Sequence, residues 1–80
     1  MDTGQKQARK YLKEAVLNEY NQITQAAALT PLQKTIVDLH IIQGLSIIQI
    51  SFREHISARN ISNQLSKVYK KIYRLIKAGS

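Results

Sequence analysis

Apolar residues recur every three or four positions through most of this chain, which is the spacing of helices with one buried face. Between positions 5 and 27, the residues on this face are Ala8, Leu12, Ala15, Val16, Tyr20, Ile23 and Ala27. Most charged and amide side chains of the same stretch fall on the opposite side. The pattern predicts one long amphipathic helix over residues 5–27, after a frayed start at residues 1–4.

Three helix-start signals follow, at Thr30, Ser46 and Ser57. A hydroxyl at such a position can accept a hydrogen bond from a backbone N–H two or three residues later. Gln33 follows Thr30 by three residues, and Gln49 follows Ser46 by three. Both starts are therefore predicted to form a reciprocal capping box.

The first of these helices should begin at Pro31, where the missing proline N–H costs nothing, and end near Gly44, which suits a left-handed closing residue. Its buried side is expected to hold Ile36, Val37, Leu39, His40 and Ile41. A short helix should follow Ser46, and a last helix should run from Ala58 to about Lys77.

The last helix divides into an apolar seam and a polar face. The seam consists of Ile61, Leu65, Val68, Ile72 and Leu75. The polar face consists of Arg59, Asn63, Ser66, Lys70, Arg74 and Lys77. The short helix, tight turn and long helix match a helix-turn-helix. We predict an all-α fold of four helices in a single domain over residues 1–80, with the N-terminal helix in residues 1–28 and the helix-turn-helix in residues 29–77.

The charge of the chain is +7, and it is concentrated towards the C-terminus. From residue 53 onward, seven basic residues face a single acid, Glu54, which gives this segment a net charge of +6. Such a segment favours a polyanionic partner such as nucleic acid. The alternative is a helix face kept charged only for solubility.

Composition argues against several other classes of protein. The chain has no cysteine for a disulfide or thiolate site, and no apolar run near the roughly 18 residues of a membrane span. There is no glycine-rich phosphate loop, paired nucleophile and histidine, or carboxylate cluster, and neither His40 nor His55 has partners at metal-ligand spacing. We expect a cytoplasmic protein that is not an enzyme and has no metal or cofactor.

The stretch from Leu29 to Ile72 resembles region 4 of the sigma-70 class of transcription initiation factors, and more loosely the LuxR-type DNA-binding domain. The matching residues are Leu29, Pro31, Val37, Leu39, the Gly44-Leu45-Ser46 step, Ile50, the Ile56-Ser57 turn, Ile61 and Leu65. The chain departs from the family at Ser51, Glu54 and His55, where Ala, Leu and Gly are usual. His55 is expected to take the left-handed conformation, and Phe52 or Arg53 to compensate for Glu54 unless the turn is altered.

The resemblance implies that the helix from Ala58 enters the major groove by its N-terminal end. The base-contacting positions it implies are Arg59, Asn60, Ser62 and Asn63. Arg59 and Asn63 are the strongest base readers, because Arg can pair with a guanine edge and Asn with an adenine edge. Phosphate contacts are expected from Ser46, Arg53, Lys67 and Lys70. Each of these side chains could instead simply be solvated, and Asn60 could merely help to cap the helix.

These observations predict a sequence-specific regulator of transcription that binds double-stranded DNA, of bacterial, phage or plasmid type. A thin core favours a homodimer, and we expect Tyr69 and Tyr73 to be packing or dimer residues rather than base-stacking platforms. One alternative is an RNA polymerase-binding or other protein-interaction module without DNA specificity of its own. A weaker alternative places the last helix on an anionic membrane.

Overall fold

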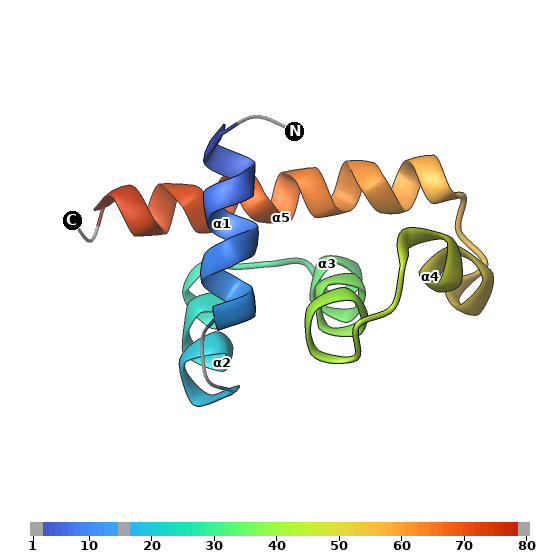
Figure 1. The fold of residues 1–80 in the computed structure, drawn as a ribbon, viewed down its shortest axis with the longest axis horizontal. Helices are drawn as coiled ribbons and strands as arrows, with labels where there is room; N and C mark the ends of the chain where they lie inside the picture. The colour runs from blue at the N-terminus through green and yellow to red at the C-terminus, as the bar shows by residue number, and fades with distance from the viewer. Residues whose placement is uncertain (1–2, 15–16, 79–80) are drawn as a thin grey trace.

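The computed structural model describes residues 3–14 and 17–78 of the 80-residue chain. Its elements are α1 (Thr3–Glu14), α2 (Leu17–Ala26), α3 (Pro31–Val37), the π-helical η1 (Asp38–Ile42), α4 (Ile47–Glu54) and α5 (Ala58–Ala78). All regular structure within these residues is helical, which confirms the predicted all-α class (Figure 1).

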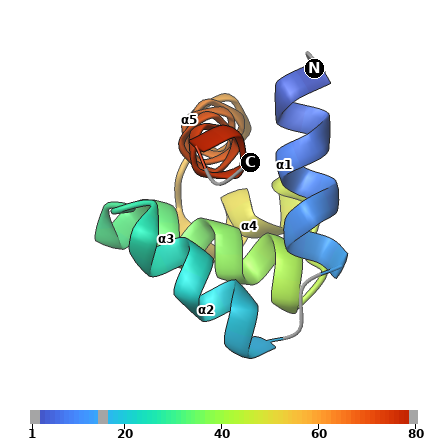
Figure 2. The same cartoon turned by 90° about the vertical axis from the view of Figure 1, so that its left-hand side faces the viewer.

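The prediction of one long N-terminal helix is wrong, because α1 and α2 are separate helices that run in different directions (Figures 1 and 2). A continuous helix over residues 3–26 would be about 36 Å long at 1.5 Å per residue, close to the 37 Å length of the whole molecule. Division into two helices brings Leu12 and Tyr20 into the same core. Ala15 and Val16, predicted for the buried face, lie outside the described residues.

The frayed start predicted for residues 1–4 is also wrong where the structure describes it, because Gly4 belongs to α1. A Cβ atom at Gly4 would lie 3.1 Å from the ring of Tyr73 on α5. This is closer than ordinary van der Waals contact, so glycine allows α1 to approach α5 at this point.

The start of α3 confirms the predicted capping box. The hydroxyl of Thr30 accepts a hydrogen bond from the Gln33 N–H at 3.2 Å, and the Gln33 side chain accepts one from the Thr30 N–H at 3.1 Å. Gln33 is buried, and its amide also donates to Gln64 at 3.2 Å and accepts from the ammonium of Lys71 at 2.9 Å. The cap therefore also joins α3 to α5.

The helix after Thr30 does not stay α-helical to its predicted end, because η1 replaces its last turns. The Gln43 N–H bonds to the carbonyl of Asp38, five residues back, at 3.3 Å. Gly44 then takes the predicted left-handed conformation with φ of 72°, and the Leu45 N–H bonds to the Leu39 carbonyl at 3.0 Å. This closing pattern satisfies the carbonyl groups at the end of the helix.

One hydrophobic core connects all of the helices. Its buried apolar residues are Ala8, Leu12, Tyr20, Ala27, Ile36, Val37, Leu39, Ile50, Ile61, Leu65, Val68, Tyr69 and Ile72. The predicted seam of α5 is confirmed from Ile61 to Ile72, whereas Leu75 is half-buried. α1 packs most extensively against α5, so the N-terminal helix covers this seam within one chain (Figure 2).

A polar network at the edge of this core ties α2 to the end of α3. The buried hydroxyl of Tyr20 donates to the carboxylate of Asp38 at 2.7 Å. The ammonium of Lys34 bonds to the same carboxylate at 2.6 Å and lies 5.2 Å from the centre of the Tyr20 ring. Burial, followed by the bond to Asp38, raises the pKa of Tyr20, so the phenol remains the donor.

Candidate nucleic-acid interface

The segment from Ser46 to Ser57 builds a short helix and a tight turn. The hydroxyl of Ser46 accepts from the Gln49 N–H at 3.1 Å, and the Gln49 side chain accepts from the Ser46 N–H at 2.8 Å, which confirms the second capping box. α4 ends at His55, which takes the predicted left-handed conformation with φ of 56° and ψ of 40°. The hydroxyl of Ser57 accepts from the Asn60 N–H at 3.2 Å and thereby begins α5 where predicted.

The compensation expected around Glu54 does not come from either neighbouring side chain. Phe52 is 78% exposed and therefore cannot replace a buried leucine. Arg53 is also exposed and lies 3.5 Å from the side-chain oxygen of Gln43. Glu54 itself is half-buried, and the left-handed His55 is followed by a hydrogen bond from the Ile56 N–H to the Ser51 carbonyl at 3.2 Å. Glu54 therefore keeps partial contact with solvent, and neither neighbouring side chain takes its place in the core.

The four predicted base-contacting residues are all exposed on the first two turns of α5. At 100° per residue, Arg59 and Asn63 point in directions about 40° apart. Asn60 and Ser62 lie on opposite flanks, about 160° from one another. The structure therefore brings Arg59 and Asn63 together on one face and does not bring Asn60 and Ser62 together.

The predicted phosphate-contacting residues are also exposed, but they are spread over two elements. Lys67 and Lys70 lie on α5, Arg53 lies near the end of α4, and Ser46 lies at its start. The Ser46 hydroxyl accepts the capping bond and keeps its own proton to donate. All four side chains are exposed to solvent, although Arg53 also donates to the Gln43 side chain at 3.5 Å.

Other basic residues already have partners within the chain. Besides its bond to Gln33, Lys71 lies 3.4 Å from the carbonyl of Ala28. Lys34 pairs with Asp38. Of the basic residues in the C-terminal segment, Lys71 is therefore held by contacts within the chain.

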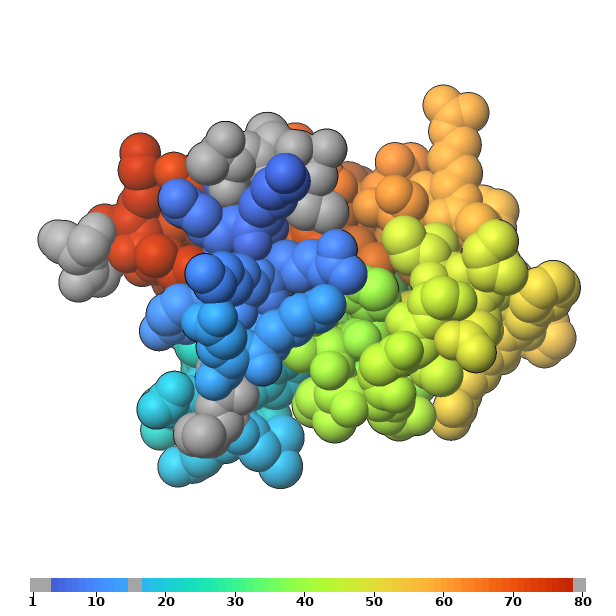
Figure 3. All heavy atoms as spheres, viewed as in Figure 1, coloured from blue at the N-terminus to red at the C-terminus, as the bar shows by residue number. Residues whose placement is uncertain are grey.

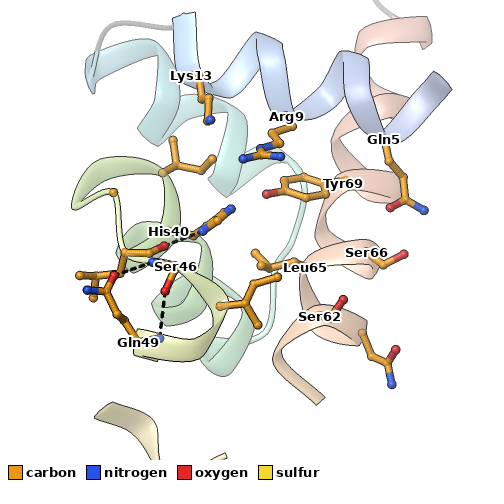
Figure 4. A pocket seen from close by; sticks show the side chains of 15 residues that line it. Gln5, Arg9, Lys13, His40, Ser46, Gln49, Ser62, Leu65, Ser66 and Tyr69 are labelled. Carbon is orange, nitrogen blue, oxygen red and sulfur yellow. Dashed lines mark hydrogen bonds between the residues drawn. The ribbon is translucent and has the colours of Figure 1, made fainter. Parts of the chain in front are cut away.

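A groove of about 1070 Å³ lies between α1 on one side and η1, the start of α4 and the first half of α5 on the other. Figure 3 faces this side of the molecule, with α1 in blue and the η1 and α4 region in green to yellow-green. Ser46 and Gln49 line it from α4, and Ser62 and Asn63 line it from α5. Figure 4 shows the α1 side chains of Gln5, Arg9 and Lys13 along its other wall.

The sequence prediction missed the contribution of α1 to this groove. Gln5, Arg9 and Lys13 are four residues apart and therefore form one stripe along α1. That spacing is visible in the sequence, but the packing of α1 against α5 and η1 is not. Two basic side chains thus join the face that carries Asn63.

The tyrosines of α5 are packing residues, as predicted. Tyr69 is buried in the core, and Tyr73 is half-buried against α1. His40, predicted for the buried side of its helix, is half-buried, and its Nδ1 lies 2.7 Å from the Leu45 carbonyl oxygen. Tyr69 and His40 line the groove, whereas Tyr73 packs against α1, and none of the three offers a fully exposed ring.

Within residues 3–14 and 17–78, none of the helices combines the length and the apolar character needed to cross a membrane. Comparison of the chain with protein-family models, curated protein sequences and solved structures gives no match. The functional interpretation therefore depends on the residues of the interface itself.

Proposed function

We propose that this protein is a sequence-specific DNA-binding regulator of transcription, in which α4, its turn and α5 act as a helix-turn-helix. α5 enters the major groove by its N-terminal end, and α4 lies across the sugar-phosphate backbone. Arg59 and Asn63 read base edges, whereas Ser46, Arg53, Lys67 and Lys70 contact phosphates.

The observation that carries this proposal is the shared exposed face of Arg59 and Asn63 on a helix whose opposite face is buried. A buried seam fixes the rotation of α5, so both side chains are held outward at its N-terminal end. Arg and Asn are suited to bidentate pairing with guanine and adenine, respectively. Only four described acids lie outside α5 to oppose the basic charge, and Asp38 among them is already paired.

The test is selection of bound sequences from random duplex DNA, carried out with the wild-type protein and with Arg59→Ala and Asn63→Ala. We expect the wild type to select a defined DNA sequence. Each variant should lose about 1 to 3 kcal/mol of discrimination between bases, at a different base pair of that sequence. Arg74→Ala is the matched control, because Arg74 is exposed on the same side of α5 about 22 Å from Arg59. Direct base reading is contradicted if both test variants keep the wild-type sequence preference. It is also contradicted if Arg74→Ala loses that preference to the same extent.

A second candidate function is protein docking, including binding to RNA polymerase. It is favoured by two apolar side chains that stand out from α4, Ile48 at 60% and Phe52 at 78% exposure. A binding assay with polymerase in the absence of DNA separates the candidates, because docking requires these residues whereas base reading requires Arg59 and Asn63. The membrane alternative is weaker, because it needs the apolar face of α5 that the core already buries.

A further inference from the structure

The hydroxyl of Tyr69 is a buried polar group without a hydrogen-bond partner among the described residues. Tyr69 is only 2% exposed, and its ring belongs to the core. In Figure 4 its phenol oxygen points into the groove, below the guanidinium of Arg9. Buried hydroxyls nearly always have a partner, so this hydroxyl is suited to one supplied by a bound molecule.

Arg9 presents a second unsatisfied donor beside it. Its Nε is buried and has no hydrogen-bond partner among the described residues. Burial raises the pKa of Tyr69, and the nearby charge of Arg9 acts in the opposite direction, which agrees with their proximity in Figure 4. The two side chains therefore offer adjacent donors in a partly desolvated place.

The rest of the groove is suited to an anion. Lys13 lies one turn beyond Arg9 on the same wall, and the N-terminus of α4 lies on the opposite wall. Among the described residues that line the groove, none is Asp or Glu. A helix N-terminus favours negative charge, and a cation with several N–H donors is the usual partner of phosphate oxygens.

We propose that this groove binds a phosphate group, held by Arg9, Lys13 and the hydroxyl of Tyr69 and facing the N-terminus of α4. The phosphate comes either from the backbone of bound DNA or from a free phosphorylated molecule. In both cases α1 belongs to the binding surface and is not only a cover for α5. The site itself does not require that the proposed DNA-binding function be correct.

The first arm of the test uses the full chain and inorganic phosphate, followed through backbone amide resonances. We expect saturable shifts at residues lining the groove. Arg9→Gln and Tyr69→Phe should each weaken binding by about tenfold or more, because each removes a hydrogen bond to a charged phosphate. Lys10→Gln removes the same charge from an exposed position of α1 that does not line the groove, and should change affinity less than about twofold.

The second arm measures how duplex DNA binding depends on salt in the same variants. If a DNA phosphate occupies the groove, Arg9→Gln should reduce the slope of log affinity against log salt concentration by about 0.9. Tyr69→Phe should weaken DNA binding. Saturable binding of inorganic phosphate with an unchanged slope identifies a free phosphorylated molecule as the source. If phosphate binds and duplex DNA does not, the site stands and the proposed DNA-binding function fails.

Two results would overturn the phosphate site. One is the absence of saturable phosphate binding together with an unchanged salt slope in Arg9→Gln and Tyr69→Phe. The other is equal weakening by Lys10→Gln and Arg9→Gln without an effect of Tyr69→Phe, which would mean that only the total charge of α1 matters. DNA binding that survives in either case leaves the proposed function intact.

Discussion

Two buried tyrosines show how differently the same side chain is used in this protein. The hydroxyl of Tyr20 donates to a carboxylate that also pairs with Lys34, so it belongs to the network that joins α2 to α3. The hydroxyl of Tyr69 has no partner among the described residues. The apolar periodicity placed Tyr20 in the core, but the partner of its hydroxyl depends on Asp38, eighteen residues away.

This contrast predicts different effects of removing each hydroxyl. Tyr20→Phe should lower the free energy of unfolding by about 1 to 2 kcal/mol, because it removes a hydrogen bond to a charged acceptor. Tyr69→Phe should leave it unchanged or raise it by about 1 kcal/mol, because no bond is lost and a buried hydroxyl without a partner is removed. Urea unfolding of the two variants provides the comparison. A larger loss for Tyr69→Phe than for Tyr20→Phe would mean that the hydrogen bonds are wrongly assigned.

Gln33 shows the limit of prediction at the level of a single residue. Its capping role follows from its distance of three residues from Thr30, which is a purely local relation. Its bonds to Gln64 and Lys71 depend on how α3 packs against α5. The sequence therefore predicts one of the functions of this side chain and not the other.

Among the elements, those with strong local end signals were predicted best. The capping residues Thr30, Ser46 and Ser57 and the left-handed Gly44 and His55 all have their predicted roles, because each depends on neighbouring backbone atoms. The separation of α1 from α2 has no such signal, since neither glycine nor proline lies between them. The π-helical η1 likewise arises within an uninterrupted apolar pattern.

Gly44 and His55, which flank α4, both have positive φ. Substitutions at the two positions should change the free energy of unfolding in opposite directions. His55→Gly should raise the free energy of unfolding by about 0.5 to 1 kcal/mol, because glycine adopts positive φ without a steric penalty. Gly44→Ala should lower it by about 1 kcal/mol. The reason is backbone strain, because among the described residues no atom beyond the two chain neighbours would lie within 4 Å of the new Cβ. Thermal unfolding of both variants measures the effect. Destabilisation by His55→Gly would contradict the assigned end of α4.

At the scale of the whole molecule, the contribution of α4 and α5 to the proposed interface follows from the sequence, and that of α1 does not. Arg59 and Asn63 follow from the rotation of α5 about its own seam. Arg9 and Lys13 line the same groove as Asn63 only because α1 packs on α5 and η1, which is tertiary information. The predicted homodimer stays a prediction, although the coverage of α5 by α1 within one chain weakens the argument from a thin core.

The central claim is that the face formed by the start of α4 and the first half of α5 binds duplex DNA. The most direct measurement is a titration of the full chain with duplex oligonucleotides at low ionic strength, followed through backbone amide resonances. We predict shifts concentrated at residues 46–49 and 58–67, with little change along α2. Resonances that do not move at all, or shifts confined to α2 and α3, would contradict the account.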